Sequence, residues 1–474
     1  MNERDRFEKL LRKRPHAHAS FFQRPQWTRR HFFRSLAAGV TGYYLAGPWS
    51  PGLSKAAAAV ETKNTAKQVI FLFLEGAPSG VDTFDLKEIA GVTPADFAPE
   101  TIQGVRFPAG ILGNTAQVLD KVAIIRSGSA WALAHPLAQT WFQIGRNPTS
   151  ALGKFAPHIG SVVAIEKEPE RRPDQIFPAF IALNAANAPG SGYLPVEFSP
   201  FKTQPDPDGL ATTEHAAGET RFRQRWDLLA SMDGSLRGPE SPLGKSATGM
   251  GELYNNAESL MFSPLVADTF GFTGEESVRY GGSAFGNACL IARKIVEADQ
   301  GTRFIQVTLG GWDHHQGIYD RQEVNGRDVG RNIYAQCGEF DPAFAALVND
   351  LEASGRLDET LIVVSGEFGR TVGPLTNANN GRDHYLQMFY AFAGGGVRGG
   401  TVIGETNTTG AFTVDPGWSR FRDVRPEDIE ASIYSALGIN WTKVRYDDPL
   451  GRGFEYVPNS DEDAYGPVHE LWGS

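Results

Sequence analysis

Apolar runs that end in an acidic residue recur along this chain, and they constrain its fold more than any other feature. The run 69–74 is followed by Glu75, and the run 304–309 leads through two glycines to Asp313. The stretch "LIVVSGEFGR" at 361–370 repeats the pattern and delivers Glu367. A segment that is apolar at successive positions predicts a strand buried on both faces. Each run is therefore expected to be a core strand with a carboxylate just beyond its carboxyl end.

Helical patterns alternate with these strands. Residues 284–298, 339–355 and 425–439 carry apolar positions at helical spacing, and further apolar runs at 121–129, 177–183 and 384–400 predict additional strands. This alternation predicts a three-layer α/β/α sandwich around a mostly parallel sheet, in a single α/β domain over residues 60–474. Residues 188–282 are rich in Gly, Pro and Ser with one helical pattern at 221–232, so we interpret them as an insertion or cap.

Residues 1–59 form a basic leader. Ten Arg or Lys stand against three acids in residues 1–34, and Thr28, Arg29, Arg30, Phe32 and Arg34 fit a twin-arginine export signal that ends in small residues near Ala59. A cytosolic basic tail is the alternative. The signal predicts a periplasmic or secreted protein and the twin-arginine export machinery as a partner. Membrane association is expected only if the signal remains uncleaved, because its apolar stretch is short and glycine-rich.

The charge balance argues against nucleic acid as a partner. The whole chain has a formal net charge of −10 although the leader is basic, so the rest of the chain is more acidic still. Binding to a polyanion depends on clustered Lys and Arg.

The acidic strand ends predict a metal site. In a parallel sheet the carboxyl ends of the strands meet at one edge, where uncompensated carboxylates would repel one another. Histidines follow in the same segments, and together the oxygen and nitrogen ligands suit a divalent metal such as zinc, manganese, magnesium or calcium. The candidate ligands are Glu75, Asp313, His315, Glu367, Asp383 and His384. The alternatives are a turn cap or Arg370 partner for Glu367, an N-cap for Asp313, a surface histidine, and a surface ion pair between Arg382 and Asp383.

Several stretches together resemble a known family. They are the twin-arginine leader, "IFLFLEGAPSGVDTFD", "GGWDHH", "TLIVVSGEFGRT", "GRDHY", "AGGGVRGGTVIGET" and "RPEDIEASIYSALGI". Between about Arg29 and Asn440 the chain resembles the exported bacterial family catalogued as domain of unknown function 1501, which is itself similar to the alkaline phosphatase and sulfatase superfamily.

The resemblance implies a fold and a set of roles. It implies an alkaline-phosphatase-like sandwich in which Glu75, Asp313 with His315, Glu367, and His384 beside Asp383 hold one or two metals. Where the superfamily has an Asp-His pair, this chain has Glu367 followed by Phe368, which puts a second metal in doubt.

The resemblance also implies a nucleophile after the second strand, within "IIRSGSAWALAHPLAQTWFQIGR". That stretch contains no Cys, which argues against a formylglycine sulfatase. Ser127 and Ser129 are the hydroxyl candidates, with turn residues as the alternative. His135 is a candidate catalytic residue, either as a metal ligand or as a general acid.

Arginines near these segments complete the prediction. Arg370 is a candidate catalytic residue that stabilises developing charge, and Arg146 and Arg382 are candidates for binding an anionic ester. We therefore expect a secreted, metal-dependent hydrolase of a phosphate, sulfate or related ester, with a small anionic ester or glycan as substrate. The alternative is a non-catalytic periplasmic or surface domain of the same fold that acts in binding or assembly.

Overall fold

The central sheet of the computed structural model has eight strands. The structure describes residues 60–473 apart from 212 and 461. Across the sheet the strand order is β14-β4-β13-β10-β1-β7-β5-β6. In chain order the strands are β1 (Gln68–Leu74), β4 (Val122–Ser129), β5 (Phe180–Leu183), β6 (Phe201–Thr203), β7 (Phe304–Leu309), β10 (Thr360–Ser365), β13 (Gln387–Ala393) and β14 (Thr401–Ile403).

The sheet is mostly parallel, as predicted. Strand β1 lies between β10 and β7 and is parallel to both, and β5 continues the parallel set toward β6. Strand β13 is antiparallel to both of its neighbours, β10 and β4, while β14 is parallel to β4. The direction of β13 therefore differs from that of every other strand in the sheet. The three strands that deliver Glu75, Asp313 and Glu367 are adjacent and point the same way.

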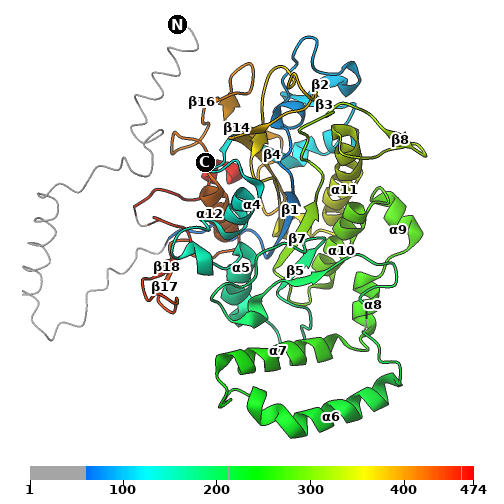
Figure 1. Ribbon diagram of the computed structural model, residues 1–474, viewed down its shortest axis with the longest axis vertical. Coiled ribbons are helices and arrows are strands. Elements are labelled where there is room, and N and C mark those ends of the chain that lie inside the picture. The colour runs from blue at the N-terminus through cyan, green and yellow to red at the C-terminus, as the bar shows by residue number, and fades with distance from the viewer. Residues whose placement is uncertain (1–59, 212, 461, 474) are drawn as a thin grey trace, which may run out of the picture. The chain divides into compact units, whose positions relative to one another are not determined.

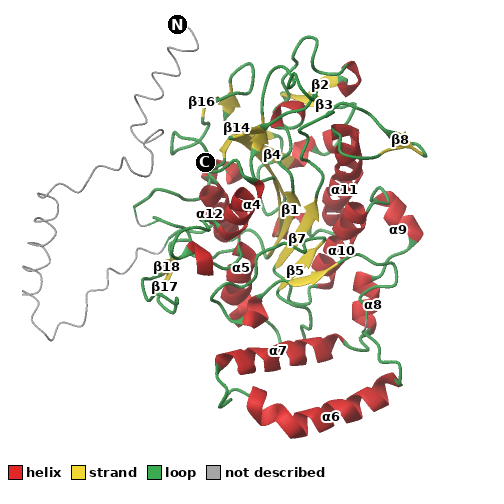
Figure 2. Cartoon of the chain, viewed as in Figure 1, coloured by secondary structure: helices red, strands yellow, loops and turns green. Residues whose placement is uncertain are grey.

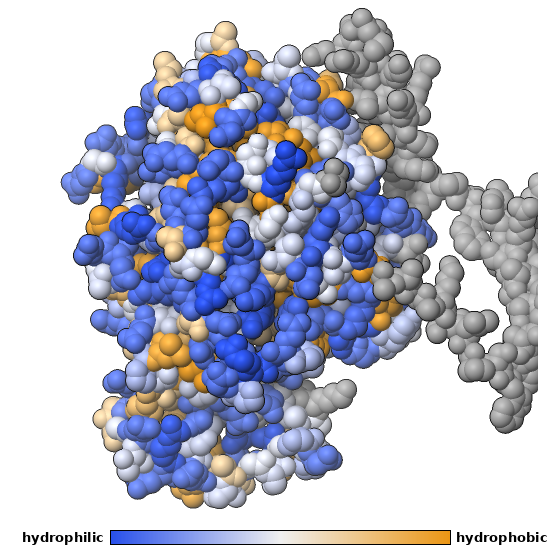
Figure 3. Space-filling model, turned by 180° about the vertical axis from the view of Figure 1, so that it is seen from behind, coloured by the Kyte–Doolittle hydropathy of each residue, from blue (hydrophilic) through white to orange (hydrophobic). Residues whose placement is uncertain are grey.

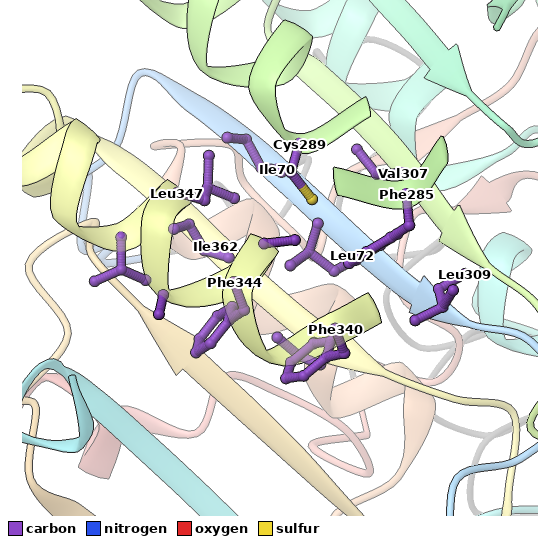
Figure 4. Close-up of a cluster of buried hydrophobic side chains, with 14 of the residues drawn as sticks. Ile70, Leu72, Phe285, Cys289, Val307, Leu309, Phe340, Phe344, Leu347 and Ile362 are labelled. Atoms are coloured by element: carbon purple, nitrogen blue, oxygen red, sulfur yellow. The ribbon is translucent and has the colours of Figure 1, made fainter. Parts of the chain in front are cut away.

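Helices cover both faces of the sheet (Figure 1). On one face lie α10 (Ala284–Ala298) and α11 (Ile333–Ala353), which pack with Ile70 and Leu72 of β1 in the main core (Figure 4). On the other face lie α4 (His135–Ile144), α5 (Ile159–Lys167) and α12 (Pro426–Ala436). Phe71 of β1 stacks on Phe142 of α4 at 5.6 Å. Successive residues of a strand point to opposite faces, so β1 joins both helical layers. The predicted three-layer α/β sandwich is confirmed.

A helical segment extends from this sandwich between β6 and β7. It contains α6 (Gly218–Arg237), α7 (Lys245–Leu260), α8 (Pro264–Phe270) and α9 (Gly274–Arg279). Helices α6 and α7 lie side by side, farther from the sheet than α8 (Figure 2). Seen from behind, this end of the molecule mixes hydrophilic and hydrophobic surface (Figure 3), and Met232 of α6 is among its exposed apolar residues. The segment lies within residues 188–282, where an insertion was predicted.

Short elements complete the described chain. Helix α3 spans Gly113–Ala116. The described chain also contains five two-stranded antiparallel ladders. Their strands are β2 (Pro99–Ile102) with β3 (Val105–Pro108), β8 (Glu323–Val324) with β9 (Arg327–Asp328), β11 (Gly369–Arg370) with β12 (His384–Tyr385), β15 (Glu405–Thr406) with β16 (Thr413–Asp415), and β17 (Val444–Arg445) with β18 (Phe454–Glu455). Within residues 60–473, no helix combines the length and the apolar character needed to cross a membrane. The predicted export signal lies outside the described residues.

Candidate metal centre

The loops after β1, β7 and β10 meet at the carboxyl edge of the sheet. Residue Gly76, just after β1, has a φ of +111°, and a Cβ there would lie 2.7 Å from the backbone nitrogen of Asp313. Glycine is needed at this position because both the positive φ and the close approach exclude a side chain. The backbone nitrogen of Trp312 donates to the carbonyl of Glu75 at 3.3 Å. The loop after β1 and the loop after β7 are therefore held together next to Asp313.

Four side chains converge at this edge in a cluster that could hold a metal ion. His135, Asp313, His315 and His384 each offer one ligand atom, and these atoms all lie within 4.8 Å of one another. Oδ1 of Asp313 lies 3.1 Å from Nε2 of His135 and 3.1 Å from Nε2 of His315. Nε2 of His384 lies 2.8 Å from Nε2 of His315. We refer to these four residues as the metal cluster.

Local structure explains how each ligand arrives. His135 is the first residue of α4, where Pro136 favours the start of a helix and Gly145 ends it with a φ of +63°. Asp313 and His315 stand in the loop that follows β7. His384 belongs to β12, where it pairs with Arg370 of β11.

The outer nitrogen of each histidine has an acceptor of its own. Nδ1 of His135 is 2.7 Å from the carboxylate of Glu367, and Nδ1 of His315 is 2.8 Å from the carboxylate of Asp383. Nδ1 of His384 is 2.5 Å from the carbonyl of Leu133. Donation from each Nδ1 to its acceptor leaves all three Nε2 atoms with lone pairs in the neutral imidazoles.

These lone pairs point into one space beside a carboxylate. Three unprotonated nitrogens and an oxygen so close together repel one another unless a cation or a proton lies between them. Three nitrogens and one oxygen are a ligand set that zinc accepts, and histidine ligands whose other nitrogen donates to a carboxylate or carbonyl are usual at metal sites. The residues present therefore fit a divalent ion.

Glu367 lies behind His135 and outside the metal cluster. Its carboxylate is buried, and it also accepts hydrogen bonds from the backbone of Gly76 at 3.0 Å and from the side chain of Gln139 at 3.0 Å. The hydrogen bond to Glu367 raises the pKa of His135 against the effect of burial. Sequence reasoning predicted Glu367 as a ligand and did not predict Gln139, although Gln139 stands four residues after His135 on the same helix face.

Arg370 contacts the metal cluster at Asp313. Its guanidinium donates to the carboxylate of Asp313 at 2.5 Å and to the carbonyls of Gly76, Ala77 and Arg382, and it is almost fully buried. Burial opposes the charge on Asp313, but the hydrogen bond and charge of Arg370 outweigh it and lower the pKa of Asp313. The backbone contacts fix Arg370 in place, so it stabilises the charge of Asp313 within the site.

Two further groups border the cluster. The buried ring of Phe368 lies 4.8 Å from the His135 ring and 4.6 Å from the His384 ring, so it forms an apolar wall. Glu75 is half-buried, and burial together with repulsion from Glu367 raises its pKa. Glu75 was predicted as a ligand, and the structure places it beside the cluster without including it.

The two neighbouring histidines of "GGWDHH" have different environments. The side chain of His314 is buried and contacts Gln336 at 3.0 Å, and burial lowers its pKa to about 4. His315 reaches the metal cluster instead, and Asp383, predicted as a ligand, orients it through Nδ1.

Arg382 is held by the protein interior. It forms a fully buried ion pair with Asp82 at 2.7 Å and also donates to Tyr319 and to two carbonyls. This pair anchors the loop that carries Asp383 and His384. Arg146, the other predicted substrate-binding arginine, is buried elsewhere, where it donates to the carbonyls of Glu455 and Tyr456. Neither guanidinium faces the cluster.

The two serines also lie outside the cluster. Ser127 is fully buried and its hydroxyl donates to the carbonyl of Pro416 at 2.8 Å. The hydroxyl of Ser129 accepts a hydrogen bond from Arg425 at 2.9 Å. Both side chains have partners that tie β4 to the chain segment before α12.

Fold and cluster together define an α/β protein with a candidate metal site at the carboxyl edge of its sheet. Residues 66–462 match the family model of DUF1501, described as a protein of unknown function. The chain therefore belongs to this family, which confirms the resemblance seen in the sequence. A search of curated proteins found no match.

Solved structures with similarity to the chain include three described as follows. A phosphonate monoester hydrolase from Silicibacter pomeroyi is 10% identical, with a TM-score of 0.38 and coverage of 86% of this chain and 77% of that one. A sulfatase from Pseudoalteromonas sp. is 12% identical, with a TM-score of 0.36 and coverage of 79% and 68%. A protein in the alkaline phosphatase superfamily from Vibrio parahaemolyticus is 10% identical, with a TM-score of 0.34 and coverage of 80% and 67%.

Proposed function

We propose that the chain is a metal-dependent hydrolase of a phosphate, sulfate or related ester. The observation that carries this proposal is the convergence of three histidine Nε2 atoms and one carboxylate, with every Nδ1 directed to an acceptor. His135, Asp313, His315 and His384 would hold one divalent ion. Such an ion acts as a Lewis acid on an ester oxygen and makes a bound water more acidic.

The chain's own residues contribute orientation and charge. Glu367 and Asp383 fix the rings of His135 and His315, and Arg370 keeps Asp313 ionised. Glu75 is half-buried and interacts electrostatically with Glu367 and His135, and its raised pKa suits a group that accepts and returns a proton during hydrolysis. We assign Glu75 the role of general acid and base.

Water is the nucleophile in this proposal. Ser127 and Ser129 use their hydroxyls in hydrogen bonds that hold β4 in place. A serine nucleophile instead needs a hydroxyl within reach of both the ester and a base.

The location of the protein is part of the proposal. The twin-arginine pattern in residues 1–34 supports export to the periplasm or beyond by the corresponding machinery. Substrates of an exported hydrolase would be small anionic esters or ester groups of glycans outside the cytoplasm.

The test is turnover by metal-loaded mature protein. Aryl phosphates and aryl sulfates are supplied with zinc, manganese, magnesium or calcium, and His384→Ala serves as the variant that lacks one ligand. We expect turnover that depends on the added ion and falls at least about hundredfold in the variant. An ion bound at full occupancy without turnover of any ester would instead support the alternative, a non-catalytic periplasmic or surface domain.

A further inference from the structure

A cavity of about 590 Å³ opens directly beside the metal cluster. Asp313 and His315 belong both to the cavity lining and to the metal cluster, so a molecule bound in the cavity would lie next to the cluster. The volume lies within the range of small-molecule sites, roughly 300–1,000 Å³. The remaining lining residues are Gln316, Gly317, Asp320, Gln322, Arg331, Asn332 and Asn379.

Backbone hydrogen bonds hold the walls of the cavity together. The nitrogen of Gly317 donates to the carbonyl of Asn379 at 2.8 Å, which joins the loop after β7 to the loop between β11 and β12. The nitrogen of Ile333, at the start of α11, donates to the carbonyl of Ile318 at 2.9 Å. Three chain segments are thus fixed relative to one another, so the cavity exists before any ligand binds.

Five of the side chains that line this frame are polar and exposed. Gln316, Gln322 and Asn379 present carboxamides, Asp320 a carboxylate and Arg331 a guanidinium. Carboxamides donate and accept, a guanidinium only donates and an ionised carboxylate only accepts. Hydroxyl groups do both, and they can therefore pair with every one of these side chains.

Other ligand classes fit this lining less well. The lining contains no Phe, Tyr, Trp or large aliphatic residue, whereas sites for apolar molecules are lined mainly by such side chains. A ligand with many negative charges would face Asp313 and Asp320, and Arg331 is the one Arg or Lys among the lining residues. The lining therefore favours a neutral molecule with many hydroxyls.

We propose that this cavity binds the polyhydroxylated, sugar-like part of the substrate and directs its ester toward the metal cluster. This inference rests on the proposed hydrolase function and names the substrate class of that site. Binding energy from such a remote part of a substrate can increase the rate at the reacting group. A sugar ester should therefore depend on the cavity, whereas an aryl ester should depend mainly on the metal cluster.

The test compares paired substrates in cavity variants. Glucose 6-phosphate is compared with p-nitrophenyl phosphate, and glucose 6-sulfate with p-nitrophenyl sulfate, in Gln322→Ala, Arg331→Ala and the double variant. Arg221→Ala on α6 is the matched control, because Arg221 is exposed and lies outside the cavity lining. We expect kcat/KM for the sugar ester to fall about tenfold or more beyond any fall for the aryl ester. Equal changes for both substrates would overturn the inference and leave the hydrolase proposal intact.

A binding measurement separates the two proposals if no ester is hydrolysed. Titration calorimetry of the metal-loaded protein with glucose 6-phosphate and glucose 6-sulfate measures binding without requiring turnover, and the double variant isolates the contribution of the cavity. Binding that weakens about tenfold or more in the double variant supports the cavity as a sugar site even though the hydrolase proposal has failed. Absence of binding by both glucose esters overturns the inference.

Discussion

The carboxylate of Glu367 lies 2.7 Å from Nδ1 of His135 and thereby decides which nitrogen of His135 faces the metal cluster. Glu367 reaches this position from the end of β10, and Gly76 and Gln139 hold it there. The same relationship recurs between Asp383 and His315. Carboxylates thus have two roles at this edge of the sheet. Asp313 belongs to the metal cluster, whereas Glu367 and Asp383 accept hydrogen bonds from the Nδ1 atoms of its histidines.

Replacing Glu367 by Gln should weaken metal binding. The amide keeps the size of the side chain but removes the charge that fixes and polarises His135, and losses of outer partners of this kind cost about 10–100-fold in metal affinity. Competition titration with zinc measures the effect. Glu430→Gln is the control, because Glu430 is also a buried carboxylate but belongs to α12, outside the metal cluster. Equal zinc affinities in Glu367→Gln and in the unmodified protein would contradict the role of Glu367.

Breaking the ion pair between Asp82 and Arg382 should destabilise the fold. Both side chains are at most 1% exposed, so Asp82→Asn leaves a buried guanidinium without its counter-charge. Such a loss costs about 3–5 kcal/mol in the free energy of unfolding. The exposed pair of Glu88 and Arg106 provides the control, where Glu88→Gln should cost less than about 1 kcal/mol. Urea unfolding compares the two variants, and similar losses in both would contradict this account.

His158 should make stability depend on pH. Burial lowers the pKa of His158 to about 3, and its Nδ1 accepts a hydrogen bond from the backbone of Gly160. The unfolded chain takes up a proton near pH 6.5, whereas the folded chain stays neutral. This stabilisation is therefore complete above pH 6.5 and decreases as the pH falls toward 3, by roughly 1.4 kcal/mol for each pH unit between these values.

The comparison with His158→Asn isolates this effect. Asparagine can keep the N-cap of α5, but it does not titrate. As the pH falls from 7 to 4.5, the unfolding free energy of the unmodified protein should approach that of the variant. Over this range the unmodified protein should lose roughly 2–3 kcal/mol more than the variant. Parallel curves would show that His158 is not kept neutral by burial.

Removal of the Ser127 hydroxyl should cost stability and leave turnover unchanged. Ser127→Ala deprives the buried carbonyl of Pro416 of its donor, which costs about 1–3 kcal/mol. The rate per folded, metal-loaded molecule with an aryl phosphate should be that of the unmodified protein, because water is the proposed nucleophile. A fall of about a thousandfold or more with intact fold and metal content would identify Ser127 as the nucleophile instead.

The convergence of the acidic strand ends was predictable from the sequence. Apolar runs marked β1, β7 and β10, and a parallel sheet brings the carboxyl ends of its strands to one edge. The structure places these three strands next to one another. Direction was not predictable for β13, because an apolar run indicates burial but does not indicate which way the strand points.

The division of roles at the site was not predictable. His135 and Glu367 are 232 residues apart, and only the contact between the start of α4 and the loop after β10 shows that Glu367 orients a histidine. The same holds for Arg382, whose partner Asp82 is 300 residues away. Residue type indicates which chemistry is possible, whereas burial and contacts decide which residue is a ligand and which holds a ligand in place.

The most direct test of the metal centre is an anomalous difference map from crystals of the protein grown with zinc. We predict one peak per chain at the carboxyl edge of the sheet, about 2.0–2.2 Å from Nε2 of His135, His315 and His384 and from the carboxylate of Asp313. A map without a peak among these four residues, at full zinc saturation and with the fold intact, would contradict the account.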